Sequence, residues 1–270
     1  MIRATLRTAY LGVLIAFAVM PLYWIVVTSI KGEPNPLASG NPWWPALPTL
    51  EHYAGLLRSP LFGAWMLNTA AVTAATLAIS LVASLLAAYA LAYLDVPFSR
   101  GIVLVFFATY LVPQGVLFVP LIRMLSRLHL TNSVLALAIT YPGLVIPFGT
   151  WVLWSLFNSL PADLIDHARI EGAGVLAILR RVVLPLAWPG LAAVGIFAVA
   201  VVFNDFLYAF TFIERVDGTT LMGGIGIANA DIGDPGFEFA AITLGMAPFA
   251  LACAFFADVY ARGLGTGIIE

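Results

Sequence analysis

The sequence has 270 residues, of which 62% are hydrophobic and only 10% are charged, and its mean hydropathy is +1.00. Soluble domains usually carry about 25% charged residues, so the surplus apolar surface must face lipid, and a soluble globular enzyme is excluded. The 12 basic and 14 acidic residues nearly cancel, which gives no sign of a nucleic-acid partner. With one cysteine (Cys253) and one lysine (Lys31), the chain has no disulfide framework, no cysteine-rich metal site and no phosphate-binding Gly-Lys-Ser/Thr loop.

Six stretches of the chain, each of at least 19 residues, contain no Asp, Glu, Lys or Arg. About 20 apolar residues in a helix cross the hydrocarbon core of a bilayer, and a charged residue at its centre costs roughly 2.5–3.5 kcal/mol. The sequence therefore predicts an all-α polytopic membrane protein. Its six transmembrane helices are expected near 9–30, 64–93, 101–125, 133–157, 183–213 and 239–261.

The basic residues between these spans predict the orientation of the chain. Seven of them fall on the side of the N-terminus and five on the opposite side, so both termini are expected in the cytoplasm. The first apolar run continues past Ala16-Phe17-Ala18 to Ile30, which favours an uncleaved first helix over a signal peptide. The chain then divides into an N-terminal helix (1–30), an extracytoplasmic loop (31–62), a transmembrane core (63–262) and a cytoplasmic tail (263–270).

The cytoplasmic connection 158–182 has the pattern of two short helices. Pro161 suits a first helical turn, and the segment that follows it can form a helix as far as Glu171. Gly172 then breaks the helix, and a second short helix can run from Val175 to Val183. The small side chain of Ala168 would allow another surface to approach closely. From the residues alone, this hairpin could equally lie on the membrane surface.

The outer connection 214–238 combines an excess of acidic residues with several glycines. It is either a solvated acidic loop or a flexible loop that docks an external protein. The residues expected to serve docking are Asp217, Gly223, Gly224, Asp231 and Asp234.

Polar residues and prolines inside the predicted spans are further candidates. Asn204 and Asp205 follow the charge-free run of the fifth span, where an intramembrane acid either lines a pathway or acts as a structural hydrogen-bond acceptor near the interface. Kinks are expected where prolines interrupt the third and fourth spans, at Pro113, Pro120, Pro142 and Pro147.

Asp166-His167-Ala168-Arg169-Ile170-Glu171-Gly172-Ala173, followed by Val182-Val183-Leu184-Pro185, carries a longer pattern. It resembles the EAA loop of binding-protein-dependent ABC importer permeases, with Asp166 in place of Glu and His167 in place of the first Ala. Phe203-Asn204-Asp205-Phe206-Leu207 and the tail Arg262-Gly263-Leu264-Gly265-Thr266-Gly267 are similar to further segments of the carbohydrate-uptake members, so the resemblance covers nearly the whole chain.

The resemblance implies the type I ABC importer permease fold and a transport subunit without catalytic residues of its own. Its coupling loop, which would dock on an ATPase subunit, falls on Asp166, Ala168, Glu171, Gly172, Leu184 and Pro185. The implied partners are two ATPase subunits that bind ATP and Mg, a second permease expected to be a different chain, an extracytoplasmic solute-binding protein and membrane lipid. No cofactor or metal is expected in this chain, and the implied location is a bacterial or archaeal cytoplasmic membrane.

The cargo implied by the resemblance is a sugar or sugar derivative. Importers of glycerol 3-phosphate or other polyols share the same pattern and are the alternative. A secondary transporter, or a membrane scaffold without transport activity, would explain the spans but not the spacing of the cytoplasmic motif.

Overall fold

The computed structural model describes residues 2–32, 37, 41, 43–161 and 163–265, with side chains described except at 2–5, 163, 229–232, 252, 253 and 255–265. This part of the chain is almost entirely helical, and its one β-type pairing is an isolated bridge between Lys31 and Pro48. The helices are α1 (Ile2–Ser29), α2 (Glu51–Arg58), α3 (Pro60–Tyr93), α4 (Ser99–Tyr110), α5 (Gln114–Arg127), α6 (Val134–Ser159), α7 (Asp163–Ile170), α8 (Val175–Ile178), α9 (Leu184–Asn204), α10 (Leu207–Phe212), α11 (Leu221–Ile232) and α12 (Pro235–Gly265). A π-helical turn (Leu179–Val183) joins α8 to α9, and a 3₁₀ turn (Val216–Gly218) precedes α11.

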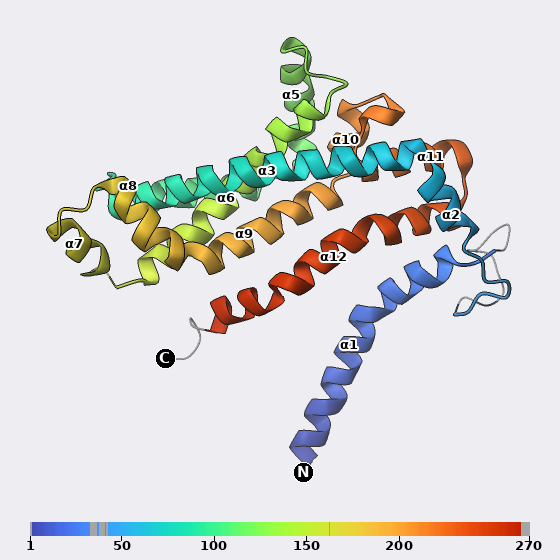
Figure 1. Cartoon of the computed structure of the whole chain (residues 1–270), viewed down its shortest axis with the longest axis horizontal. Coiled ribbons are helices and arrows are strands. Elements are labelled where there is room, and N and C mark those ends of the chain that lie inside the picture. The colour runs from blue at the N-terminus through green and yellow to red at the C-terminus, as the bar shows by residue number, and fades with distance from the viewer. Residues whose placement is uncertain (1, 33–36, 38–40, 42, 162, 266–270) are drawn as a thin grey trace.

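The long helices form a bundle around α3, which packs against α6, α9 and α4 (Figure 1). Helix α12 lies along α9, whereas α1 diverges from the bundle and packs mainly against α12 (Figure 1). One end of the bundle carries α2 and α11, and the other carries α7 and α8 (Figure 1). These are called the outer and inner ends, after the orientation that the basic residues predict.

Helix α3 contributes side chains to each of the three apolar clusters that hold the bundle together. The inner cluster contains Ala88 and Tyr89, the middle cluster contains Val72, and the outer cluster contains Phe62 and Trp65. Since neighbouring helices have no hydrophobic driving force in lipid, such close packing is what holds them together there.

The predicted all-α membrane architecture is confirmed. Four helical segments are long and apolar enough to cross a bilayer (Leu6–Ser29, Pro60–Tyr93, Val134–Ser159 and Val175–Asn204), α4 and α5 form a bent pair, and the described part of α12 contributes a shorter apolar stretch. Two spans expected as single helices are broken, however. The third bends by 91° between Tyr110 and Gln114, and the fifth is interrupted at Asp205 and Phe206.

Proline accounts for the first of these breaks but does not break every helix that contains it. Pro113 begins the second arm of the bent pair, because its ring fixes φ and removes a donor. In contrast, α6 continues through Pro142 and Pro147 and packs against α3 along its length. Packing against neighbouring helices therefore allows α6 to remain a continuous helix through both prolines.

Candidate functional site

The two broken spans meet at a polar cavity near the outer end of the bundle. The hydroxyl of Tyr208, in α10, donates to the backbone carbonyl of Gln114, the first residue of α5, across 2.8 Å. Backbone that leaves a helix at membrane depth is tolerated where it is buried in protein or lines a cavity. This cavity has a volume of about 460 Å³ and is lined by Tyr110, Gln114, Leu144, Phe197, Ala200, Val201, Asn204, Asp205, Phe206 and Leu207.

Asp205 lies at the edge of this cavity, with both carboxylate oxygens bonded to the protein. Its side chain accepts a hydrogen bond from the Tyr141 hydroxyl at 2.7 Å and from the backbone N–H groups of Ala209 and Tyr208 at 3.1 and 3.4 Å. The residue is only 8% exposed. Asp205 thus caps the first turn of α10 and ties it to α6, so that the carboxylate is held by the protein rather than offered freely to the cavity.

Asn204 is exposed and lies in a different setting. Its Nδ2 donates to the carbonyl of Ala200, one turn back in α9, at 2.9 Å. This orientation leaves the side-chain oxygen as an acceptor at the cavity wall. Both residues predicted to line the pathway border the cavity. Of the two, Asn204 has the side-chain oxygen that can accept a hydrogen bond from a ligand.

Aromatic rings continue from the cavity toward the inner end. Tyr110 and Phe197 line the cavity, and both contact Phe148, with ring centroids 5.6 and 4.2 Å from it. Trp151 lies 6.2 Å from Phe148, one turn nearer the inner end, and packs against Phe107 at 4.9 Å. An aromatic layer from α4, α6 and α9 therefore borders the polar cavity on its inner side.

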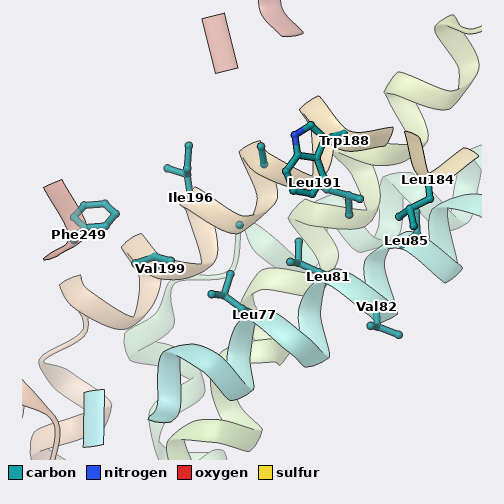
Figure 2. A pocket seen from close by; sticks show the side chains of 12 residues that line it. Leu77, Leu81, Val82, Leu85, Leu184, Trp188, Leu191, Ile196, Val199 and Phe249 are labelled. Atoms are coloured by element: carbon teal, nitrogen blue, oxygen red, sulfur yellow. The ribbon is translucent and has the colours of Figure 1, made fainter. Parts of the chain in front are cut away.

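A second cavity, of about 490 Å³, lies between α3 and α9 and has a different chemistry. Figure 2 shows Leu77 and Leu81 of α3 and Leu191 and Ile196 of α9 around it, with Phe249 of α12 at one side. Apolar side chains line it almost completely, so it offers little to satisfy the hydroxyl groups of a sugar. We therefore assign it to lipid or protein packing rather than to the pathway.

The predicted coupling segment forms two short helices that project from the inner end of the bundle (Figure 1). In α7, Ile165 is 4% exposed and Ala168 packs beside it against the inner cluster. The small residue expected to admit another surface thus brings α7 close to its own bundle. Side chains on the remaining surface point outward, including Leu164, Asp166, His167 and Ile170.

Gly172 ends α7 in a left-handed turn, as the glycine pattern predicts. Its φ is +80°, its N–H donates to the Arg169 carbonyl, and the N–H of Ala173 donates to the Ala168 carbonyl. This pair of bonds is a Schellman motif, in which the left-handed position strongly favours glycine. The exposed Glu171 lies immediately before the turn.

Leu184 and Pro185 begin α9 directly after the π-helical turn. Proline has no N–H, and its ring crowds the carbonyl four residues back. The wider π-helical turn accommodates Pro185, so the helical backbone continues from α8 into α9 without a loop. The N–H of Leu184 donates to Leu179, five residues back. Leu184 itself lines the apolar cavity of Figure 2.

The outer connection 214–238 is largely helical, whereas its glycines suggest a flexible loop. Gly223 and Gly224 lie in α11, where a Cβ on Gly224 would overlap the ring of Trp65. Their small size serves close packing rather than freedom of motion. The docking role of this connection stays a prediction.

The three aspartates of this connection are in three settings. Asp217 is exposed and receives hydrogen bonds from Arg215, which lower the pKa of its carboxyl below the usual value. Asp234 accepts from the backbone N–H of Gly236 at the start of α12 and lies 3.6 Å from His52 Nδ1. Asp231 is in the last turn of α11, but its side chain lies outside the described residues.

Several residues of these sites have no signal in the sequence. Tyr141 and Tyr208 lie in apolar runs, and only their contacts with Asp205 and with the bent pair give them a role. Arg169 is also unexpected, because it links α7 to the end of α3. Within the described residues, no three of His, Cys, Asp or Glu lie close enough together to hold a metal ion.

Comparison with known proteins agrees with this architecture. The chain is 32% identical to the sulfoquinovosyl glycerol transport system permease protein SmoH of Agrobacterium fabrum, over 97% of the chain and 92% of that protein. It is 26% identical to the trehalose/maltose transport system permease protein MalG of Thermococcus litoralis, over 93% and 91%. The fold is similar to a chain of a bacterial ABC transporter involved in the import of the acidic polysaccharide alginate, with a TM-score of 0.77, 20% identity and coverage of 95% and 96%.

A second solved structure, of the bacterial alginate ABC transporter in complex with an alginate pentasaccharide-bound periplasmic protein, matches with a TM-score of 0.58 and 15% identity, over 95% of both chains. Residues 79–266 match the family described as the binding-protein-dependent transport system inner membrane component. That match contains the cytoplasmic segment, the polar cavity and most of the bundle. The chain belongs to this family of membrane components of binding-protein-dependent transport systems.

Proposed function

We propose that this chain is one of two permease subunits of an ATP-driven importer that moves a sugar delivered by an extracytoplasmic solute-binding protein. The observation that carries the proposal is the polar cavity at the junction of the two broken spans, above the aromatic layer. Names of the relatives support a carbohydrate cargo, since they include permeases for sulfoquinovosyl glycerol, diacetylchitobiose and trehalose or maltose.

The lining of the cavity suits a neutral sugar better than a phosphate ester. Asn204 and Gln114 offer amide groups for hydroxyls, and the rings of Tyr110 and Phe197 offer faces for the C–H surface of a pyranose. Among the described residues that line the cavity there is no lysine, arginine or histidine to neutralise a phosphate. On this subunit's side, the cavity therefore favours a neutral sugar over glycerol 3-phosphate.

The energy for transport would come from partner ATPase subunits that contact α7. Ile170 is 84% exposed and Leu164 is also exposed, so the outer face of α7 presents apolar groups at the inner end of the bundle. Docking that face in a cleft of an ATPase would bury these groups, while Ile165 keeps α7 fixed to the bundle. Closure of the two ATPases, driven by ATP and Mg, would then displace the bundle.

Purification of the chain from native membranes tests the assembly. We expect an ATPase and a second permease to copurify with the chain in mild detergent. Transport activity of the chain without any ATPase would instead identify a secondary transporter. A chain without partners and without a transport phenotype on deletion would be a scaffold.

Uptake of radiolabelled compounds tests the cargo. The panel should contain a neutral disaccharide, a sulfonated glycoside and glycerol 3-phosphate, with and without the solute-binding protein. Asn204→Ala should reduce uptake per assembled complex. Asn158→Ala is the matched control, because Asn158 Nδ2 also donates to the carbonyl four residues back, at 2.7 Å, but Asn158 lies outside the polar cavity. Equal uptake in the two variants would contradict the assignment of the cavity.

A further inference from the structure

Among the long helices in the described part of the chain, α3 alone has no internal proline. Its 34 residues span about 50 Å, and its proline, Pro60, occupies the first turn, where it does not interrupt hydrogen bonding. Among the other long helices, α1, α6, α9 and α12 each contain an internal proline. Because sharp kinks in helices arise mostly at proline, α3 is the stiffest direct connection between the two ends of the described bundle.

The outer end of α3 is hydrogen-bonded to the start of the outer connection. Trp65 Nε1 donates to the carbonyl of Val216 at 2.6 Å. Asn68 Nδ2 donates to the carbonyls of Asp217 and Thr219 at 3.1 and 3.0 Å. The backbone N–H of Leu221 donates to Thr69 Oγ1 at 2.9 Å. Three side chains on one face of α3, in two adjacent turns, therefore fix residues 216–221, which are called the outer strap below.

The inner end of α3 is bonded to the coupling segment through one arginine. Arg169 Nη2, in α7, donates to the carbonyl of Tyr93 at 2.7 Å, and Nη1 lies 3.4 Å from Asp166 Oδ1. Tyr93 is the last residue of α3, so its carbonyl has no partner within the helix, and a cation there is favoured by the helix dipole. The hydroxyl of Tyr93 donates to the carbonyl of Phe157 in α6, which fixes the same corner of the bundle.

We infer that α3 is a rigid strut that transmits displacement of the outer strap to α7, with Arg169 as the positioning residue at its inner end. Because α3 is packed in all three apolar clusters, an axial or tilting movement at one end cannot be absorbed by a kink and must appear at the other. Arg169 converts that movement into movement of α7, since its guanidinium is bonded to both elements. The inference rests on the proposed function, in which a solute-binding protein acts outside and an ATPase inside.

The test uses the complete complex, reconstituted in lipid, and measures stimulation of ATP hydrolysis by the sugar-loaded binding protein. The variants are Arg169→Ala, Asn68→Ala and the double variant, with Arg169→Lys as the conservative change. Arg180→Ala is the control, because Arg180 is an exposed arginine of the same cytoplasmic segment. Each single variant should lower maximal stimulation by about fivefold or more, as expected for loss of coupling between two sites. The basal rate and the concentration of binding protein that gives half the maximal effect should be unchanged, and Arg169→Lys should recover part of the stimulation.

The double variant decides between a shared route and two local defects. If both residues act through α3, the double variant should stimulate about as well as the more impaired single variant, because both changes weaken the same connection. The proposal that α3 is a strut would be refuted if the fold losses of stimulation multiplied in the double variant. It would also be refuted if the Arg169→Ala complex were stimulated as strongly as the Arg180→Ala complex. Absence of any ATPase in the purified complex would instead refute the proposed function itself, so the two failures are distinguishable.

Discussion

The position of Asp205 predicts that its loss is first of all a loss of stability. Asp205→Ala removes the acceptor for two backbone N–H groups in the first turn of α10 and leaves the buried hydroxyl of Tyr141 without its partner. Loss of a helix cap costs about 1 kcal/mol, and an unsatisfied buried hydroxyl costs about 1–3 kcal/mol. The variant should therefore be destabilised by about 2–4 kcal/mol.

The same geometry predicts how substitutions at Asp205 and Tyr141 combine. Asp205→Asn keeps the shape and one good acceptor, so its cost should be about 1 kcal/mol, the difference between a charged and a neutral hydrogen bond. Tyr141→Phe should cost a similar amount alone. In the double variant Asp205→Ala/Tyr141→Phe, no hydroxyl is left unpaired, so that variant should be at least as stable as Asp205→Ala.

The assay is the temperature at which the detergent-solubilised complex loses its monodisperse peak, together with uptake normalised to complex abundance. The midpoints should fall in the order unmodified chain, Asp205→Asn, Asp205→Ala, and uptake per assembled Asp205→Asn complex should stay near normal. An Asp205→Asn complex that is fully stable but does not transport would refute this reasoning, because it would show that the charge serves the pathway directly.

Three further predictions concern glycines and the outer surface. Gly224→Ala should destabilise the complex by about 1–3 kcal/mol in the same thermal assay, because its Cβ overlaps Trp65; Gly55→Ala, with open space around it, is the control and should be neutral or stabilising. Gly172→Val should reduce uptake per ATP hydrolysed, because a β-branched residue is strained at φ +80°. Gly172→Asn should retain coupling, since Asn tolerates the left-handed region, and equal coupling in the two variants would exclude a role for the turn. Asp217→Asn should weaken stimulation by the binding protein if the exposed carboxylate contacts it, and unchanged stimulation would remove Asp217 from the docking surface.

The sequence predicts those parts of the fold in which local pattern and tertiary packing agree. Apolar runs of sufficient length identified α1, α3 and α6, and glycine at position 172 identified the end of α7, because only a few residue types tolerate its left-handed backbone. The interruption at Asp205 was not predicted, since a lone acid after an apolar run is compatible with a continuing helix. Its position becomes evident only once Tyr141, 64 residues away in the sequence, is found to donate to it.

Composition was misleading where a residue type serves two purposes. Glycines in the outer connection suggested flexibility, yet Gly224 admits the ring of Trp65. Pro113 coincides with a sharp bend, whereas Pro142 lies within a continuous helix that packs against α3, α9 and α4. Ala168 packs inward on the bundle, and no spacing rule distinguishes this contact from packing on a partner, so its docking role stays a prediction.

ATP-dependent uptake of labelled sugar into proteoliposomes, with the purified complex and its binding protein, tests the central proposal most directly. We expect uptake to require ATP inside and sugar-loaded binding protein outside, and to fall in Asn204→Ala and Gly172→Val at normal complex content. In Gly172→Val, ATP hydrolysis should persist without matching uptake. Uptake that proceeds without ATP, or that is equal in vesicles lacking this chain, would contradict the account.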